Sequence, residues 1–555
     1  MKMREWQLDK IKVLSVVFLI LFFGLIVRLS YWQIIKGEEL GMQAKSQYRS
    51  TQILKAPRGQ IMAPDGSFWA IRSEVWRVIA NPTKIKDDPS KIARVLSDDP
   101  VEKDRIVELL EKKDLVWVSL KEKLTLDEKR NIEAMGLVGI SFESMESRFY
   151  PEASVAGQLL GFVGKNIEGE NVGYFGLEGY YDLPLSGKSG FLGRETGAAG
   201  SPILLGNARQ TEVVSGTELV TSLDKRIQIT LYNKLKEGME KYGAKGGSII
   251  VMDPASGAIL GMESYPSYDP GQYWEYGDLF FKNPAISDSF EPGSIFKVIV
   301  MSSALDAGVI EPDSKCDICD GPVKVDKYSI ETWDRKYFPD SEMTDVIVHS
   351  DNVGMTFVGQ KLGADVLYDY LDKFGIGKPT GIDLQGEASP GLRKKGTWNI
   401  VDLATASFGQ GVATTPIQIV RAVSAIANDG ILTTPRIVTT TQKEENVRVI
   451  SAESADEITA MMAQAAKNGE AKWTNLRGFK VAGKTGTAQI PIAGHYDDEK
   501  TNASFIGFAP YDKPKFVMLV TLREPQSSPW ASETAAPLWY SVAKDIFPYL
   551  GIHPE

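Results

Sequence analysis

Residues 291–300 read Glu-Pro-Gly-Ser-Ile-Phe-Lys-Val-Ile-Val, and the apolar run that begins there continues to Leu305. The Pro-Gly pair interrupts the preceding segment, so the run predicts a buried helix. Ser294 then lies at the helix N-terminus, where unpaired backbone N–H groups favour developing negative charge. Lys297 follows one helical turn later on the same face. This spacing places a hydroxyl and an amine together at the start of one helix.

The pair can form a nucleophile and its base. A serine hydroxyl reacts slowly at neutral pH unless a base lies within hydrogen-bond reach. Apolar neighbours surround Lys297 in the sequence, and burial lowers the pKa of a lysine enough for it to act as that base. The motif alone carries little weight, because roughly two Ser-x-x-Lys matches are expected by chance in a chain of this length.

Two later motifs change that assessment. Ser350-Asp351-Asn352 follows in a polar turn, and Lys484-Thr485-Gly486-Thr487 comes much later on an apolar strand. Ser-x-x-Lys, Ser-Asp-Asn and Lys-Thr-Gly together are the signature of penicillin-binding proteins and serine β-lactamases. Three motifs in this order with matching contexts are far less probable by chance than any one of them. They predict a serine acyl-transfer site.

Composition excludes several other classes. A chain of 555 residues predicts about two or three domains. The net charge of −10 argues against nucleic-acid binding. The three histidines have no nucleophile-elbow context, so a Ser-His-Asp triad is not indicated. Cys316 and Cys319 lack the partners of a zinc site and the context of a redox motif, which leaves a short disulfide or two free thiols. No metal or cofactor is predicted.

The N-terminus predicts a membrane anchor. Residues 13–35 are apolar except for Arg28 and a few polar positions, and they are long enough to span a bilayer if Arg28 reaches the interface. The preceding residues 1–12 are rich in lysine and arginine, so this tail should stay in the cytoplasm while the rest is exported. No small-x-small cleavage site follows, which favours an uncleaved anchor over a signal peptide.

The rest of the chain predicts a charged segment with exposed helices followed by an α/β domain. After a helical stem in residues 36–55, two exposed amphipathic helices are expected around 106–110 and 126–130. Four apolar strands and two flanking helices then predict an antiparallel sheet with a helical insertion, an α/β sandwich. The strands are expected at 247–252, 258–262, 503–508 and 516–522, and the helices at 227–242 and 536–550.

Over nearly its whole length the chain resembles the monofunctional class B penicillin-binding proteins, and most of all the division-type peptidoglycan D,D-transpeptidases. The resemblance rests on the three motifs above and on further stretches: Phe408-Gly409-Gln410-Gly411 with Thr415-Pro416, Gly375 to Gly386, Arg58-Gly59, Arg148-Phe149-Tyr150-Pro151 and Gly176-Leu177-Glu178-Gly179. One departure is Met62-Ala63-Pro64, which stands where the family usually has an acidic and a basic residue.

The resemblance implies a multidomain α+β protein. Its expected parts are a cytoplasmic tail (1–12), a single transmembrane helix (13–35), an extended β-rich pedestal resembling a dimerisation domain (36–215, with a head subdomain at about 84–145) and a penicillin-binding, serine β-lactamase-like α/β sandwich (216–555). Arg58, Arg148 and Glu178 are expected to brace the pedestal by charge pairing, without a direct part in catalysis.

For the reaction, the resemblance implies that Ser294 attacks the carbonyl of the penultimate D-alanine of a peptidoglycan stem peptide. Lys297 takes the hydroxyl proton, and Ser350 relays a proton to the leaving amine. Asn352 holds Lys297 and the substrate amide. A side-chain amine of a second stem peptide then takes the acyl group, which makes the cross-link.

The Lys-Thr-Gly strand is expected to bind the other end of the donor. Lys484 and Thr485 suit its terminal carboxylate. Backbone N–H groups of Ser294 and Thr487 form the oxyanion hole, and a side chain at Gly486 would crowd the ligand.

The resemblance also implies ligands, partners and a location. Stem peptides and β-lactams are the expected ligands, and a membrane-embedded SEDS-type glycan polymerase and divisome proteins are the expected partners. The expected location is the bacterial cell membrane, with the catalytic domain outside the cytoplasm. Two alternatives stay open. The first is a carboxypeptidase or β-lactamase on the same scaffold, which the anchor and the large N-terminal domain disfavour. The second is a non-enzymatic scaffold, which the intact set of polar motif residues disfavours, or a β-lactam sensor, whose cytoplasmic output domain the short tail before Val13 is not expected to supply.

Overall fold

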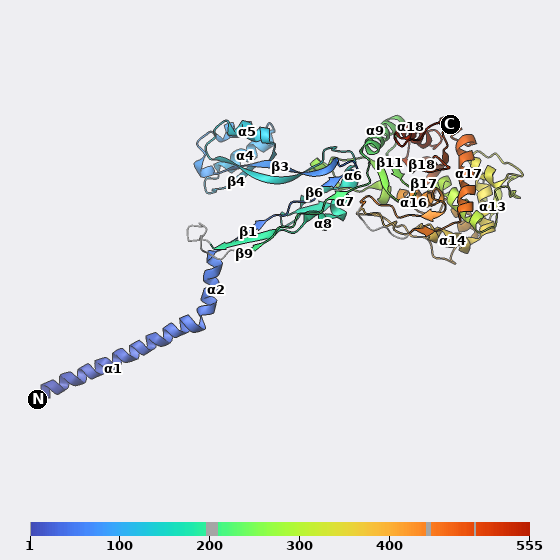
Figure 1. Ribbon diagram of the computed structural model, residues 1–555. Helices are drawn as coiled ribbons and strands as arrows, with labels where there is room; N and C mark the ends of the chain where they lie inside the picture. The colour runs from blue at the N-terminus through green and yellow to red at the C-terminus, as the bar shows by residue number, and fades with distance from the viewer. Residues whose placement is uncertain (1, 196–208, 440–445, 493–494) are drawn as a thin grey trace. The chain divides into compact units, whose positions relative to one another are not determined.

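The computed structural model describes residues 2–195, 209–439, 446–492 and 495–555 (Figure 1). Its contacts group the chain into two units, one made of residues 1–58 and 186–216 and the other of residues 59–185 and 217–555. The first unit is discontinuous because the strand at residues 190–195 returns to pair with the strand that follows the N-terminal helices, and the strand at residues 209–211 pairs with it in turn.

The N-terminal unit is a long helix followed by a small sheet. Helix α1 (Lys2–Ser30) continues through a π-helical turn, η1 (Tyr31–Ile35), and α2 (Gly37–Tyr48) follows. Within the described residues, one helical segment, Asp9–Ile35, is long and apolar enough to cross a membrane, and its apolar side chains are exposed. Three antiparallel strands complete the unit in the order β1–β8–β9: β1 (Arg49–Leu54), β8 (Gly190–Glu195) and β9 (Arg209–Thr211).

The second unit begins with a sheet built around one long strand. Strand β3 pairs along its first half with β2 and β5 and along its second half with β4 and β5, and the short β10 adds in parallel to β2. The strands are β2 (Ile61–Met62), β3 (Phe68–Ala80), β4 (Val118–Leu124), β5 (Ile140–Phe149) and β10 (Leu219–Val220).

Three helices form a separate small core against the far end of this sheet: α3 (Pro89–Leu96), α4 (Pro100–Glu111) and α5 (Leu126–Glu133). The two helices expected around 106–110 and 126–130 are therefore present. The expectation that they are solvated surface helices was incomplete, because Ile106 and Leu110 are fully buried. They pack with Ile92 and strand β4 into a small hydrophobic core, so one face of each helix is buried and only the other is solvated.

Several short elements follow β5 in the chain: α6 (Gly157–Leu160), the hairpin of β6 (Phe162–Lys165) and β7 (Asn171–Tyr174), α7 (Gly176–Tyr180) and α8 (Asp182–Ser186). A buried ion pair ties this segment to β5. Arg148 Nε donates to Glu178 Oε1 over 2.6 Å, and Arg148 Nη1 donates to the Gly59 carbonyl over 2.7 Å. Arg58, in the N-terminal unit, is also buried.

Residues 217–555 are built on a five-stranded antiparallel sheet in the order β12–β11–β19–β18–β17. The predicted α/β sandwich is confirmed, and most predicted strands and both flanking helices lie close to their expected bounds, but the strand expected at 503–508 begins earlier, at His495. The elements are α9 (Lys225–Tyr242), β11 (Gly246–Met252), β12 (Ile259–Tyr265), β17 (Ala482–Ile492), β18 (His495–Ala509), β19 (Phe516–Arg523) and α18 (Ala535–Tyr549).

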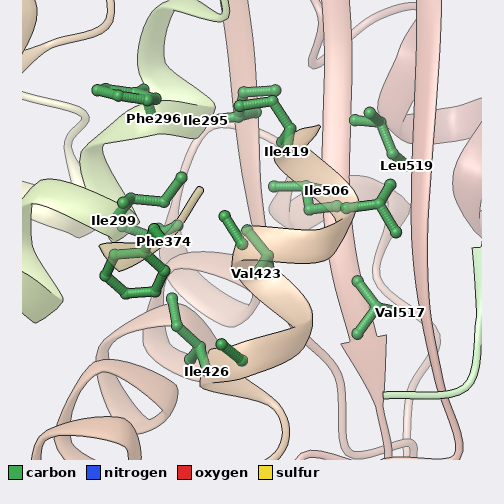
Figure 2. Close-up of a cluster of buried hydrophobic side chains, with 14 of the residues drawn as sticks. Ile295, Phe296, Ile299, Phe374, Ile419, Val423, Ile426, Ile506, Val517 and Leu519 are labelled. Atoms are coloured by element: carbon green, nitrogen blue, oxygen red, sulfur yellow. The ribbon is translucent and has the colours of Figure 1, made fainter. Parts of the chain in front are cut away.

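Each face of this sheet contributes to its own core. Along β19, Met518 packs into the core shared with α9 and α18, whereas its neighbours Val517 and Leu519 pack into the core on the opposite face. This alternation follows from the two-residue side-chain period of a strand. Figure 2 shows the second core, where side chains from the helices, such as Ile299 and Val423, fill the space on one side of the strand residues Ile506, Val517 and Leu519.

A helical insertion between β12 and β17 builds that second core. It includes α10 (Pro284–Ser287), the 3-10 turn η5 (Gly293–Phe296), α11 (Lys297–Asp306), α12 (Met343–Val348), α13 (Asn352–Leu362), α14 (Ala364–Lys373), α15 (Ile400–Ser407), α16 (Pro416–Ile426) and α17 (Ala452–Asn468). Because η5 packs against the edge strand β17, the first and third sequence motifs lie side by side.

Candidate active site

The Ser-x-x-Lys segment starts a buried helix, as predicted, but its first turn is tighter than an α-helix. Residues 293–296 form the 3-10 turn η5, and the α-helix proper begins at Lys297. Gly293 has a positive φ of +56°, which glycine adopts without strain. Its N–H donates to the Gly409 carbonyl over 3.0 Å. The turn that carries Ser294 is therefore held from one side by the loop around Gly409.

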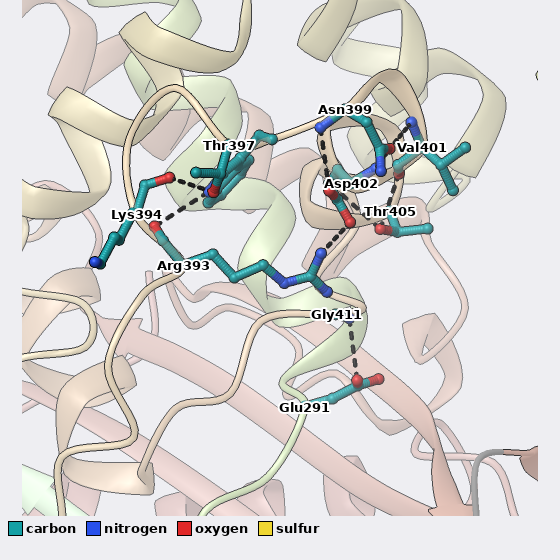
Figure 3. A network of polar contacts seen from close by, with 10 residues as sticks. Glu291, Arg393, Lys394, Thr397, Asn399, Val401, Asp402, Thr405 and Gly411 are labelled. Atoms are coloured by element: carbon teal, nitrogen blue, oxygen red, sulfur yellow. Dashed lines mark hydrogen bonds and ion pairs between the residues drawn. The ribbon is translucent and has the colours of Figure 1, made fainter.

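That loop needs glycine because the two backbones nearly touch. A Cβ at Gly409 would lie 2.2 Å from the Gly293 carbonyl oxygen, and Gly409 has a φ of +80°. A polar network braces the same loop (Figure 3). The Glu291 carboxylate accepts a hydrogen bond from Gly411 N over 3.0 Å, and Arg393 pairs with Asp402, which lies in the first turn of α15 and forms a capping box with the N-cap residue Asn399.

Ser294 opens onto a polar pocket in this unit. Residues from all three sequence motifs line it, together with residues from the Gly409 loop and from three loops that carry no motif. The lining residues are Gly293, Ser294, Trp333, Ser350, Asn352, Phe408, Gln410, Glu470, Thr485, Thr487 and Trp530.

Lys297 is completely buried beneath this pocket. Its Nζ donates to the Ser350 carbonyl over 2.6 Å and to Asn352 Oδ1 over 2.8 Å, and it lies 3.3 Å from Ser350 Oγ. Burial first, and then the positive charge of Lys484, lowers the pKa of Lys297 to about 7. A lysine with this pKa is available as a neutral base near neutral pH.

Ser350 occupies a strained turn between α12 and α13. Its φ is +56°, in the left-handed region that a residue with a side chain rarely adopts. Asp351 caps α13 by accepting from Val353 N over 2.7 Å, and so holds the turn. This backbone directs the Ser350 hydroxyl between two lysines, with Lys484 Nζ donating to it over 2.9 Å.

Lys484 lies on the edge strand β17 and is 3% exposed. Its Nζ also reaches Thr485, with the carbonyl oxygen at 3.1 Å and Oγ1 at 3.2 Å. Burial lowers the pKa of Lys484, and the negative charge of Glu470 opposes that shift. Thr485 Oγ1 in turn donates to Glu470 Oε2 over 2.8 Å.

The other two residues of this motif have structural contacts of their own. Thr487 Oγ1 accepts from Ala531 N over 3.0 Å, which fixes the loop that carries Trp530. The structure shows a reason within the protein for glycine at position 486, in addition to the expected crowding of the ligand. A Cβ there would meet Ile295 Cγ2 at 2.8 Å and Ser504 Oγ at 2.9 Å, so crowding arises within the protein itself.

The structure thus brings Ser294, Lys297, Ser350, Asn352 and the Lys484–Thr487 strand into one site. Sequence reasoning missed three pocket residues. Trp333 and Trp530 lie with ring centroids 5.1 Å apart at the pocket, and Glu470 follows α17. None belongs to a motif, and each reaches the site from a loop. Cys316 and Cys319, left open by the sequence, form a disulfide.

Comparison with known proteins finds two sequence families along the chain. Residues 247–547 match the family described as "Penicillin binding protein transpeptidase domain". Residues 53–221 match the "Penicillin-binding Protein dimerisation domain". The first match alone spans more than half of the chain and contains the site just described. The second match covers the β-rich segment before it.

Individual proteins match over nearly the full length. "Stage V sporulation protein D" of Bacillus subtilis is 31% identical over 97% of this chain and 86% of that protein. "Probable peptidoglycan D,D-transpeptidase PenA" of Neisseria meningitidis is 30% identical over 96% of this chain and 92% of that protein. The crystal structure of penicillin binding protein 2X from Streptococcus thermophilus superposes with a TM-score of 0.74 at 26% identity, covering 90% of this chain and 80% of that chain.

Proposed function

The chain belongs to the class B penicillin-binding proteins and is a peptidoglycan D,D-transpeptidase, and we propose that Ser294 is its nucleophile and Lys297 the general base. Ser294 Oγ attacks the carbonyl of the penultimate D-alanine of the donor, and its proton passes to the neutral amine of Lys297. The observation that carries this proposal is the burial of Lys297, with a pKa of about 7, beneath the pocket that Ser294 lines.

Ser350 is proposed to move the proton onward. Its oxygen accepts from Lys484 at 2.9 Å and lies 3.3 Å from Lys297 Nζ, so its own proton is free to point into the pocket. It can therefore return the proton that Lys297 receives to the leaving amine of the terminal D-alanine. Asn352 keeps Lys297 in place through the 2.8 Å hydrogen bond. An amine of a second stem peptide then attacks the acyl-enzyme and regenerates Ser294.

The edge strand is proposed to hold the donor during these steps. Backbone N–H groups of Ser294 and Thr487 form the oxyanion hole, since both residues line the pocket. Lys484 and Thr485 bind the terminal carboxylate as a cation and a hydroxyl donor. Gly486 keeps the strand close to η5, because any side chain there would meet Ile295.

The nucleophile is tested by intact mass of the full-length protein in detergent after incubation with benzylpenicillin. A stable adduct is expected on the wild-type protein and none on Ser294→Ala. The aminoacyl cross-link is then tested with a stem-peptide thioester donor and an added acceptor amine. An adduct that hydrolyses within seconds and releases opened drug would contradict the transpeptidase assignment and favour a β-lactamase.

We also propose a domain arrangement and a location for this enzyme. Residues 1–12 form a cytoplasmic tail, 13–35 the membrane anchor, 36–215 the pedestal with its head at about 84–145, and 216–555 the transpeptidase domain. The apolar helical segment Asp9–Ile35 supports the anchor. The anchor lies in the bacterial cell membrane. Basic residues ahead of it support a cytoplasmic location for the N-terminal tail. Protease digestion of intact spheroplasts should remove the catalytic domain; protection of that domain would contradict this topology.

A membrane-embedded SEDS-type glycan polymerase and divisome proteins are the proposed partners. The exposed apolar side chains of Asp9–Ile35 offer a surface that a polymerase within the membrane can cover. Replacing residues 13–35 with an unrelated transmembrane helix should abolish co-purification with the polymerase and leave benzylpenicillin acylation unchanged. Unchanged co-purification would place the contact elsewhere in the chain.

A further inference from the structure

Glu470 is an acidic side chain inside a pocket that must accept an anion. It lines the same pocket as Ser294, Thr485 and Thr487, and it follows the C-terminal end of α17. Its Oε2 accepts the Thr485 hydroxyl proton over 2.8 Å. No step of the proposed reaction uses this carboxylate, and the acyl donor itself carries a carboxylate at its leaving-group end.

The hydrogen bonds of the resting site leave the two groups assigned to that carboxylate already occupied. A threonine hydroxyl has one proton, and the proton of Thr485 points to Glu470. An ammonium group has three protons, and those of Lys484 are directed at Ser350 Oγ, Thr485 O and Thr485 Oγ1. A donor carboxylate must therefore turn the Thr485 proton away from Glu470 in order to bind.

The negative charge of Glu470 opposes binding of a donor carboxylate, as the hydrogen-bond geometry does. An ionised Glu470 offsets part of the positive charge that Lys484 presents to the pocket, and it repels a second carboxylate brought near it. A neutral acyl donor experiences neither effect. The side chain is only partly exposed, so solvent screens this repulsion incompletely.

We propose that Glu470 is a positioning residue that acts through Thr485 and Lys484 and slows acylation by donors with a free carboxylate. The site's discrimination between anionic and neutral donors is then set by Glu470. This inference rests on the proposed function, because it requires that the acyl group is transferred to Ser294 and that the edge strand binds the donor carboxylate.

The test compares benzylpenicillin with its methyl ester on the full-length protein, by following acylation of Ser294 with intact mass over time. Glu470→Gln keeps the size of the side chain and removes its charge. It should raise the second-order acylation rate with benzylpenicillin roughly fivefold and change the rate with the ester by less than about twofold. Glu470→Asp retains the charge, so its ratio of the two rates should stay at the wild-type value.

Glu453→Gln is the matched control, because it removes one negative charge from the exposed first turn of α17, far along the helix from the pocket. It should leave both rates unchanged. A Glu470→Gln protein that acylates both donors faster or slower by the same factor, or that reacts more slowly with benzylpenicillin, overturns the role of Glu470. Wild-type protein that neither donor acylates at Ser294 overturns the proposed nucleophile as well, which distinguishes the two failures.

Discussion

Lys484 Nζ donates to Ser350 Oγ over 2.9 Å, although 134 residues separate the two along the chain. The same hydroxyl lies 3.3 Å from Lys297 Nζ, so one serine contacts both buried lysines of the site. Two ammonium groups so close together repel each other, and this repulsion contributes to the lowered pKa of Lys297. The hydrogen bond from Lys484 orients Ser350 for the proposed proton path, and the charge of Lys484 adds to burial in lowering the pKa of Lys297, the proposed base.

The first prediction concerns pH. The base must be neutral to accept the Ser294 proton, and Lys297 has a pKa of about 7, so the acylation rate should rise from pH 6 to pH 8. The fraction of neutral Lys297 is small below the pKa and approaches one above it. Second-order acylation rates with benzylpenicillin, measured across this range at constant ionic strength, should follow one ionisation near pH 7. A rate that does not change with pH would exclude Lys297 as the titrating base.

The second prediction is that Ser350→Ala lowers the acylation rate by roughly two to four orders of magnitude. The change removes the hydroxyl that links Lys297 and Lys484 and leaves the helices on either side in place. Stopped-flow acylation and thermal unfolding should be measured on the same preparation. A variant that unfolds at the wild-type temperature and acylates at the wild-type rate would show that Ser350 moves no proton.

The third prediction uses two glycines with nearly the same φ. Gly409 and Gly396 have φ values of +80° and +77°, but only at Gly409 would a Cβ clash, at 2.2 Å from the Gly293 carbonyl oxygen. Gly409→Ala should therefore lower the free energy of unfolding by about 1–3 kcal/mol more than Gly396→Ala. It should also slow acylation, because it displaces the turn that carries Ser294.

Gly396→Ala is the control in that comparison. An added Cβ at Gly396 meets nothing within 4 Å, so this variant reports only the cost of the positive φ. Free energies of unfolding are measured with denaturant. Equal losses for the two variants would show that the close approach of Gly409 to Gly293 does not require glycine at position 409.

The fourth prediction is that Glu178→Ala reduces stability more than it reduces acylation. Glu178 is fully buried and accepts from Arg148 Nε over 2.6 Å, so the change leaves a largely buried guanidinium without this partner. Removing one partner of such a pair costs about 3–5 kcal/mol. Thermal unfolding should shift to a lower temperature, while the protein that stays folded should acylate normally. Folded Glu178→Ala protein that fails to acylate would assign Glu178 a part in the chemistry.

Much of the architecture could be predicted before any coordinates. Apolar periodicity located α9, α18 and the strands β11, β12 and β19 close to their observed bounds, and it located the C-terminal half of β18. The Pro-Gly pair before Ser294 correctly marked the start of a buried helix. These features are local, because each depends on neighbouring residues whose pattern is visible in the sequence.

Other features could not be predicted because they arise between distant segments. Ile106 and Leu110 were expected on surface helices, and they are buried because α3 and β4 close over them. Glu470, Trp333 and Trp530 belong to no motif and enter the pocket on loops. The need for glycine at position 486 depends on Ile295, which approaches from another element.

The sequence by itself predicted which residues carry the proposed chemistry, because the three motifs combine a candidate nucleophile, a candidate base and anion-binding groups in a recognisable order. Only the tertiary structure decided how those groups meet. It buries Lys297 enough to lower its pKa, places Ser350 between two lysines, and sets Glu470 against Thr485. Burial and hydrogen bonding between residues far apart in the chain depend on how the helices pack against the sheet, and that packing is a property of the whole fold.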